Sequence, residues 1–172
     1  MIIIGIDPGV NTGYAEWSTE LMRLRWVGSM DILDAVAEIQ RRTRPSAEGR
    51  IELVIWEDAR LRKWFGTKGR ESLQGAGSIK RDCGIWAEFF ASTGIPNCPV
   101  KPQVGGTKWT SAAFAKLTGW TEHTNEHGRD AAMLVFGISI ARASQMLGAS
   151  TAARSSGTQG RARSTAKPSA SR

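Results

Sequence analysis

The sequence is poor in the residues that build disulfide frameworks and zinc sites. Cys83 and Cys98 are its only cysteines, and they form neither a CxxC pair nor a ligand pair with the two histidines. The longest uncharged apolar run near the C-terminus, 131–141, is far shorter than the roughly 20 residues of a membrane-spanning helix. The apolar start, Ile2–Ile4, follows no basic segment and is soon interrupted by Asp7, so it is not a signal peptide. We therefore expect a protein of a reducing cytoplasm, with no membrane partner.

Acidic residues are absent from the last part of the chain. The 172 residues carry 23 Lys and Arg against 16 Asp and Glu, which gives a formal net charge of +7 and a pI near 10.0. Five of these positive charges belong to 149–172, which also lacks large apolar side chains. The composition predicts one domain over 1–148, a disordered basic tail over 149–172 and a polyanionic partner. The tail either adds non-specific nucleic-acid affinity or is a passive solubilising extension.

The apolar patterns predict an α/β fold. In chain order, we expect strands at 1–7, 11–17 and 22–26, a helix at 31–42, a strand at 51–57, a basic glycine-rich segment at 58–81 leading into an amphipathic helix that ends near 91, a strand at 96–101, a glycine turn and helix within 105–119, and a helix at 128–147. Three successive strands predict an antiparallel meander. The helix between the third and fourth strands predicts a parallel crossover.

Two acidic residues end apolar strands. Asp7 follows the run Ile2–Ile6 and precedes a Pro-Gly turn, and Glu57 ends the strand IELVIWE before a basic loop. If the first and fourth strands are neighbours, these carboxylates lie side by side. Their mutual repulsion then favours a bound divalent metal. A turn-capping role for Asp7 is the alternative.

The segment EHGRD supplies a second pair. His127 and Asp130 are three residues apart and share a helix face, so both side chains can face the strand ends that carry Asp7 and Glu57. Such a set suits two divalent ions about 3.5–4 Å apart, which activate water and stabilise a leaving oxygen. The alternative is an ordinary helix start with a cap and a favourable acid. From the sequence alone, the nearby Glu126 and Asp58 can replace members of the set.

The motifs IIIGIDPGVNTGYA, VIWED and HGRDAA resemble those of RuvC-type Holliday junction resolvases, which belong to the ribonuclease H-like superfamily and include phage members. The resemblance covers about 1–147. It implies a central five-stranded mixed sheet, with the first three strands antiparallel, flanked by helices. It also implies an active site made of an acid on the first strand, a Glu ending the fourth, and a His or Asp three residues before an Asp on the last helix. These motif positions are Asp7, Glu57, His127 and Asp130.

The same resemblance implies a homodimer in a bacterial cell or a phage-infected host. It would bind a four-way DNA junction and make two symmetric nicks with Mg²⁺ or Mn²⁺, leaving 5′-phosphates, without a small-molecule cofactor. Two active sites in a dimer match a two-fold substrate. By the same analogy, we expect the dimer to use the apolar side of the helix at 71–91.

A basic segment follows Glu57 and predicts a DNA clamp. Family members carry an aromatic directly after the Glu, whereas Trp64 and Phe65 come seven and eight residues later here. They would either insert at the junction as a wedge or anchor the loop to the core. Lys101 and Lys108, in PVKPQVGGTKW, are phosphate contacts by resemblance, with ordinary surface lysines as the alternative. The remaining candidate DNA contacts are Arg60, Arg62, Lys63, Lys68, Arg70, Lys80 and Arg81.

The functional prediction is a structure-selective DNA endonuclease that resolves four-way junctions in recombination and repair. A broader debranching nuclease that cuts flaps and forks has the same motifs, and a catalytically silent nucleic-acid-binding member has the same fold. RNA is a further possible substrate because the superfamily includes ribonucleases. An actin-like ATPase shares a glycine turn like DPGVNTG, but it needs two lobes and a much longer chain.

Overall fold

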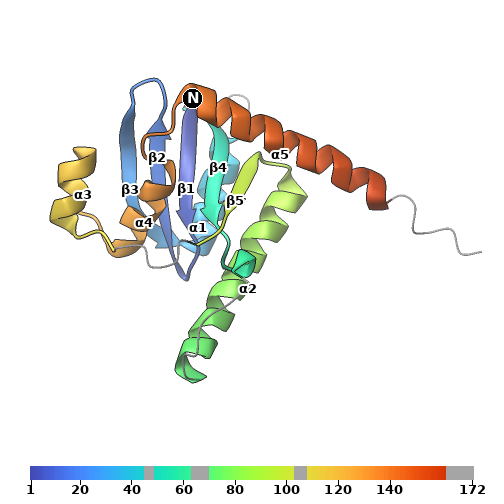
Figure 1. The fold of residues 1–172 in the computed structure, drawn as a ribbon, viewed down its shortest axis with the longest axis horizontal. Coiled ribbons are helices and arrows are strands. Elements are labelled where there is room, and N and C mark those ends of the chain that lie inside the picture. Colours follow the sequence, from blue (N-terminus) through green and yellow to red (C-terminus); the bar gives the residue numbers. More distant parts are fainter. Residues whose placement is uncertain (45–48, 63–69, 103–107, 162–172) are drawn as a thin grey trace, which may run out of the picture.

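The computed structural model describes residues 1–44, 49–62, 70–102 and 108–161, and it places five strands in one sheet of order β3-β2-β1-β4-β5 (Figure 1). The pairs β1–β2 and β2–β3 are antiparallel, whereas β1–β4 and β4–β5 are parallel. The strands are β1 (Ile2–Asp7), β2 (Asn11–Ser18), β3 (Arg23–Asp31), β4 (Ile51–Glu57) and β5 (Asn97–Val100). This order and these directions confirm the predicted mixed sheet and its ribonuclease H-like α/β architecture.

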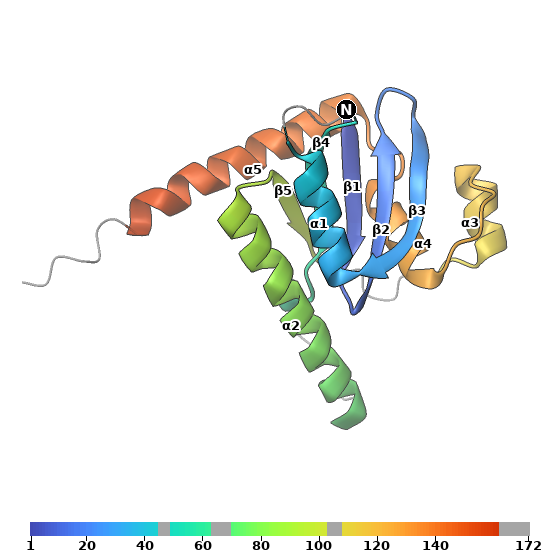
Figure 2. The ribbon, with the colours of Figure 1, turned by 180° about the vertical axis from the view of Figure 1, so that it is seen from behind.

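Helices cover both faces of the sheet (Figures 1 and 2). The helices α1 (Ile32–Arg42) and α2 (Arg70–Thr93) lie on one face, and α3 (Ser111–Thr118), α4 (Glu126–Val135) and α5 (Ile140–Arg161) pack on the other. A short 3-10 helix, η1 (Ala59–Leu61), follows β4.

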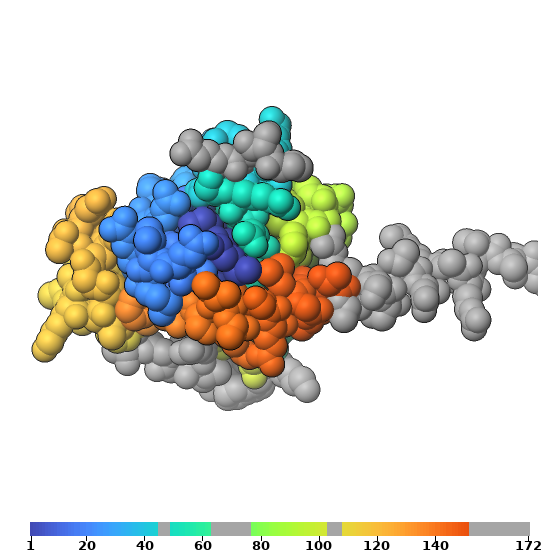
Figure 3. Space-filling view, turned by 90° about the horizontal axis from the view of Figure 1, so that it is seen from above, coloured from blue at the N-terminus to red at the C-terminus, as the bar shows by residue number. Residues whose placement is uncertain are grey.

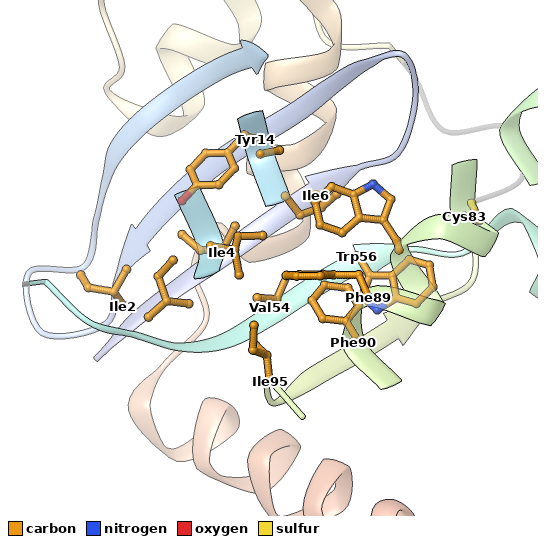
Figure 4. Packing of buried hydrophobic residues seen from close by; sticks show 14 of the residues in the cluster. Ile2, Ile4, Ile6, Tyr14, Val54, Trp56, Cys83, Phe89, Phe90 and Ile95 are labelled. Atoms are coloured by element: carbon orange, nitrogen blue, oxygen red, sulfur yellow. The ribbon is translucent and has the colours of Figure 1, made fainter. Parts of the chain in front are cut away.

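Alternation along β1 divides the core into two clusters. Ile4 and Ile6 face α1 and α2, whereas Ile3 faces α4. Figure 4 shows the first cluster, in which Trp56 of β4 meets the aromatic side chains of α2. On the predicted apolar side of α2, Cys83, Trp86 and Phe90 are buried here and so are not available for the expected dimer surface, whereas Ile79 on the same side is 45% exposed.

Glycines in the sheet let α4 approach its backbone directly. A Cβ atom at Gly5 would collide with the carbonyl oxygen of Ala131, and one at Gly13 would collide with the carbonyl oxygen of His127. The contact places the first turns of α4 against the carboxyl end of β1. The side chains that begin this helix therefore reach the strand ends.

Gly5→Ala is expected to destabilise the protein by about 1–3 kcal/mol, because the added methyl group overpacks the contact with α4. For a chain of this size, each kcal/mol lowers Tm by roughly 2–4 °C. Gly84→Ala on α2 is the matched control, since a Cβ there meets nothing within 4 Å and alanine favours the helix. Thermal melting of both variants tests the prediction. An unchanged Tm for Gly5→Ala would contradict the close approach.

Three predicted boundaries differ from the structure. The single helix expected at 128–147 is two helices, α4 and α5, bent by 90° at a break that contains Gly137, whose φ is +78°. The apolar stripe continues through this break, so the pattern did not reveal it. The helix α2 begins at Arg70, next to the start expected for a helix at 71–91 but well inside the basic glycine-rich segment expected to extend to 81. The helix α5 continues to Arg161, into the segment for which composition predicts disorder, and 162–172 lie outside the described residues.

Within the described ranges, no single helix is long and apolar enough to cross a membrane. The bent pair of α4 and α5 passes that test only when the two helices are taken together.

Candidate active site

The carboxyl ends of β1 and β4 bring two acidic side chains to one edge of the sheet. These strands are parallel neighbours with Ile6 in register with Trp56, so Asp7 and Glu57 occupy the next position on each strand. The Asp7 side chain is 20% exposed, and Glu57 is half-buried. The structure thus brings together the two carboxylates that the strand pattern predicted.

The first turn of α4 adds His127 and Asp130 to this edge. The Nδ1 atom of His127 lies 3.0 Å from Oδ2 of Asp7, within hydrogen-bond distance. Asp130 lies near enough that its charge raises the pKa of both Asp7 and Glu57. The cap of α4 is Asn125, whose side chain accepts a hydrogen bond from the Gly128 amide. His127 and Asp130 are therefore not needed for capping, which was the alternative role.

Burial and neighbouring negative charge both raise the pKa of Asp7 and Glu57 in this set, named here the carboxylate site (Asp7, Glu57, His127 and Asp130). Burial is the largest cause that raises the pKa of Glu57 to about 7, and the charges of Asp7 and Asp130 act in the same direction. Burial also raises the pKa of Asp7, although its hydrogen bond with His127 opposes the change. Arg62 and Lys108, both predicted DNA contacts, act from nearby to lower the pKa of Glu57 and Asp7 respectively.

The donor atoms of the carboxylate site fit a hard divalent cation. Carboxylate oxygens with one imidazole nitrogen are ligands that Mg²⁺ and Mn²⁺ accept, and a cation would relieve the repulsion. In the part of the chain that the structure describes, no group of three or more His, Cys, Asp or Glu side chains is gathered closely enough to hold an ion. The carboxylate site therefore fits a divalent cation by the chemical type and the charge of its donor atoms.

The two neighbouring carboxylates are engaged in other contacts. Asp58 caps η1 and accepts two side-chain hydrogen bonds from Arg60, at 2.8 and 2.9 Å. Burial alone would raise the pKa of Asp58, but the bonds from Arg60 outweigh it and lower the pKa. Glu126 forms an ion pair with Lys108. Neither carboxylate takes the place of Asp7, Glu57 or Asp130.

The predicted DNA contacts are dispersed. The Arg60 guanidinium is held by Asp58 and lies 5.8 Å from the centroid of the Trp56 ring, which limits its reach toward a phosphate. Lys80, Arg81 and Lys101 are exposed. The other predicted contacts are not described: Lys63, Trp64, Phe65 and Lys68 lie outside the described residues, and only the backbone of Arg70 is described.

One positioning residue was missed at the sequence level. Arg129 donates hydrogen bonds to the carbonyl oxygens of Trp109 (2.7 Å) and Thr124 (2.9 Å). These bonds tie both ends of the segment containing α3 to α4, beside Lys108. The only sequence signal for Arg129 was its place between His127 and Asp130. That place does not reveal that its partners are the backbone carbonyl groups of Trp109 and Thr124.

The structure is an α/β fold with a ribonuclease H-like strand order, and it carries carboxylates at the ends of β1 and β4. No family model and no curated protein matches the chain. Among solved structures, the chain is similar to the Thermus thermophilus RuvC structure, with 18% sequence identity, a TM-score of 0.42, and coverage of 90% of this chain and 97% of that one.

Proposed function

We propose that this protein is a metal-dependent endonuclease that resolves four-way DNA junctions. The observation that carries the proposal is the convergence of Asp7, Glu57, His127 and Asp130 at one edge of the sheet, where their charges oppose one another. A protein gains no stability from such a set, so a bound cation and an anionic substrate supply the reason for it. The motif resemblance supports DNA as the substrate.

The carboxylate site would hold Mg²⁺ or Mn²⁺, two ions for each active site. When bound, these ions supply an activated water and neutralise charge on the scissile phosphate. The hydrogen bond from His127 fixes the orientation of the Asp7 carboxylate. Glu57, with a pKa near 7 in the metal-free protein, can hold a proton on a carboxylate oxygen at neutral pH. Arg62 and Lys108 flank the site with positive charge that suits a DNA backbone.

Paired nicks on a two-fold junction require two copies of the site, so we propose a homodimer. Cys83, Trp86 and Phe90 are buried in the core of the same chain, so they are not open to a partner. Ile79, four residues before Cys83 on the same side of α2, is 45% exposed, and Ile85 is 42% exposed. We propose these two residues as the contact that this helix offers to a partner.

The test is a cleavage assay with purified protein, Mg²⁺ or Mn²⁺, and a panel of four-way junction, fork, flap, linear duplex and RNA–DNA hybrid. Symmetric paired nicks confined to the four-way junction are the expected result. Cutting across all branched substrates would instead indicate a debranching nuclease, and tight binding without cutting would indicate a silent binding protein. Asp34→Asn is the matched control, because Asp34 is an exposed acid on α1 outside the site.

Replacing Trp64 and Phe65 with Ala is expected to reduce distortion of the junction centre, because an inserted aromatic replaces base stacking. Fluorescence transfer between labelled junction arms measures the distortion, and affinity for linear duplex is the reference. We expect duplex affinity to stay within about twofold, because an unbroken duplex offers no unstacked base. Equal losses on junction and duplex would contradict the wedge.

A further inference from the structure

Four exposed arginines gather at the end of the sheet opposite the carboxylate site. Arg23 and Arg25 begin β3, Arg44 follows α1 and Arg50 precedes β4. None of these side chains has a hydrogen bond or ion pair with another described residue. Figure 3 looks down on this end of the molecule and shows the β2–β3 turn near the start of β4.

Gly49 is the point around which these arginines lie. Its carbonyl oxygen accepts a hydrogen bond of 2.8 Å from Arg42, and a Cβ placed on Gly49 would lie 3.7 Å from Nη1 of Arg25. Arg50 is the next residue, and Arg44 is two residues beyond Arg42. The Arg25 guanidinium and the chain positions of Arg44 and Arg50 therefore lie around one point at this end of the sheet.

A buried ion pair holds this surface in place. Arg42 pairs with Glu16 of β2, and their side chains are only 8% and 11% exposed. Arg42 is consequently not available to a ligand, but it fixes Gly49 against the sheet. Glu38 is likewise bound to Arg41, through hydrogen bonds of 2.7 and 3.0 Å.

Glu20, in the turn between β2 and β3, is paired with the N-terminal ammonium, and two other acids remain to be counted against the four arginines. Glu52 is exposed on β4 close to Arg50. Glu48 belongs to the segment outside the described residues. Counting both, the four exposed arginines still leave an excess of positive charge on this surface.

Trp26, an exposed aromatic residue, follows Arg25 directly on β3. Trp26 is opposite Glu16, whereas Leu24 is opposite Trp17, so Arg25 is an extra residue without a partner on β2. This bulge places Arg25 next to Trp26 at the outer edge of the sheet. Figure 2 shows β3 as the outer strand next to β2.

The Trp26 ring is held rigidly but remains 37% exposed. Its indole meets the Tyr14 ring edge-on, with centroids 5.3 Å apart. A Cβ on Gly28 would lie 2.6–3.2 Å from three carbons of the indole ring. The ring fits here because Gly28 has no side chain. An exposed aromatic ring on a strand that also carries two unpaired arginines suits single-stranded nucleic acid, whose bases stack on the ring and whose phosphates the arginines neutralise.

We propose that the edge surface, made of Arg23, Arg25, Trp26, Arg44 and Arg50, binds single-stranded DNA, with an unpaired base stacked on Trp26. The choice of DNA over RNA rests on the proposed function. The surface itself is separate from the carboxylate site, since Asp7 is in register with Gly13 and, through it, with Ser29, which lies two strands away from Asp7 and about 10 Å along β3 from Trp26. A nuclease of branched DNA would thereby hold an unpaired flank while the carboxylate site faces the scissile phosphate.

The test measures binding of a fluorescein-labelled 12-residue oligo(dT) to the full chain by anisotropy, in EDTA so that cleavage cannot contribute. The double variant Arg25→Gln/Arg44→Gln is expected to lose about tenfold in affinity. Its salt dependence, the slope of log K against log salt, should weaken by about 0.7 for each phosphate contact removed. Lys116→Gln/Arg142→Gln, which removes two exposed positive charges elsewhere, is the matched control and should bind within about twofold of wild type. Equal affinity of the two double variants would overturn the proposal.

Substitutions of Trp26 test the stacking component. Trp26→Leu is expected to lose about tenfold in affinity for oligo(dT), whereas Trp26→Phe, which keeps an aromatic face, should lose less than threefold. Normal binding by Trp26→Leu would overturn the stacking. Melting curves show whether each variant is folded. Because EDTA prevents cleavage in this assay, a failure of the proposed cleavage leaves this test intact, and a failure here leaves the cleavage proposal intact.

Discussion

Asp7→Asn is expected to abolish junction cleavage while leaving junction binding unchanged or tighter. Asp7 ends β1 beside Glu57 and receives the His127 hydrogen bond, so the amide removes a charged oxygen ligand at the centre of the set. Loss of one group that stabilises charge in a reaction costs on the order of 100- to 1,000-fold in rate, and we expect the upper end of that range here. Single-turnover cleavage of a four-way junction measures it.

Binding separates this explanation from misfolding. A carboxylate near the scissile phosphate repels the DNA backbone, so its neutralisation should maintain or strengthen binding in Ca²⁺ or EDTA. Asp34→Asn, an exposed acid in the first turn of α1, should change neither cleavage nor binding. If Asp7→Asn lost binding together with cleavage, Asp7 would be a structural residue and the proposed site would be wrong.

Much of the sheet could be predicted because its signals are local. The β-branched run that ends at Asp7 and the apolar run that ends at Glu57 each identify one strand and one carboxylate, and the helix between 31 and 42 requires a parallel crossover. These signals predicted two strand ends with carboxylates, but whether Asp7 lies beside Glu57 depended on the pairing of β1 with β4, which the structure shows. The periodicity of EHGRD likewise placed His127 and Asp130 on one face of a helix start.

Features decided by tertiary contacts were not predictable from such patterns. The break between α4 and α5 occurs inside a continuous apolar stripe, because α4 must lie along the sheet while α5 crosses its end, as Figure 1 shows. The pairing of Lys108 with Glu126 joins residues that are far apart in the sequence. The same is true of Arg42 and Glu16, whose buried ion pair has no local signature.

The dimer surface illustrates the opposite error. The spacing of Cys83, Trp86 and Phe90 correctly defines one apolar face of α2, but a face does not reveal its partner. The sheet of the same chain covers this face, where the rings of Trp86 and Phe90 stack with their centroids 5.6 Å apart. The apolar face of α2 therefore predicted correctly that these side chains are buried. It did not show that they pack against the sheet of the same chain rather than against a partner.

Glu57→Gln is expected to reduce cleavage by at least about 100-fold and at the same time to stabilise the metal-free protein at pH 8. Burial and the charges of Asp7 and Asp130 raise the pKa of Glu57 from 4.5 to about 7, so the folded protein binds its proton more tightly than the unfolded chain does. Stability is therefore lost as pH rises from about 4.5 through 7. The glutamine avoids this loss at pH 8 and offers no such gain at pH 4.5, where Glu57 is largely protonated in the folded state.

The size of the stabilisation follows from the exposure of Glu57. Because the side chain is only half-buried, water screens part of the repulsion, and we expect about 1 kcal/mol, or roughly 2–4 °C in Tm. Mg²⁺ should raise the Tm of the wild type more than that of Glu57→Gln, since a cation relieves the same repulsion that the variant removes. Glu52→Gln, an exposed acid on the same strand, is the control and should show neither effect. Equal Tm values for wild type and Glu57→Gln at pH 8, with equal responses to Mg²⁺, would remove the electrostatic reason for a metal at this edge of the sheet.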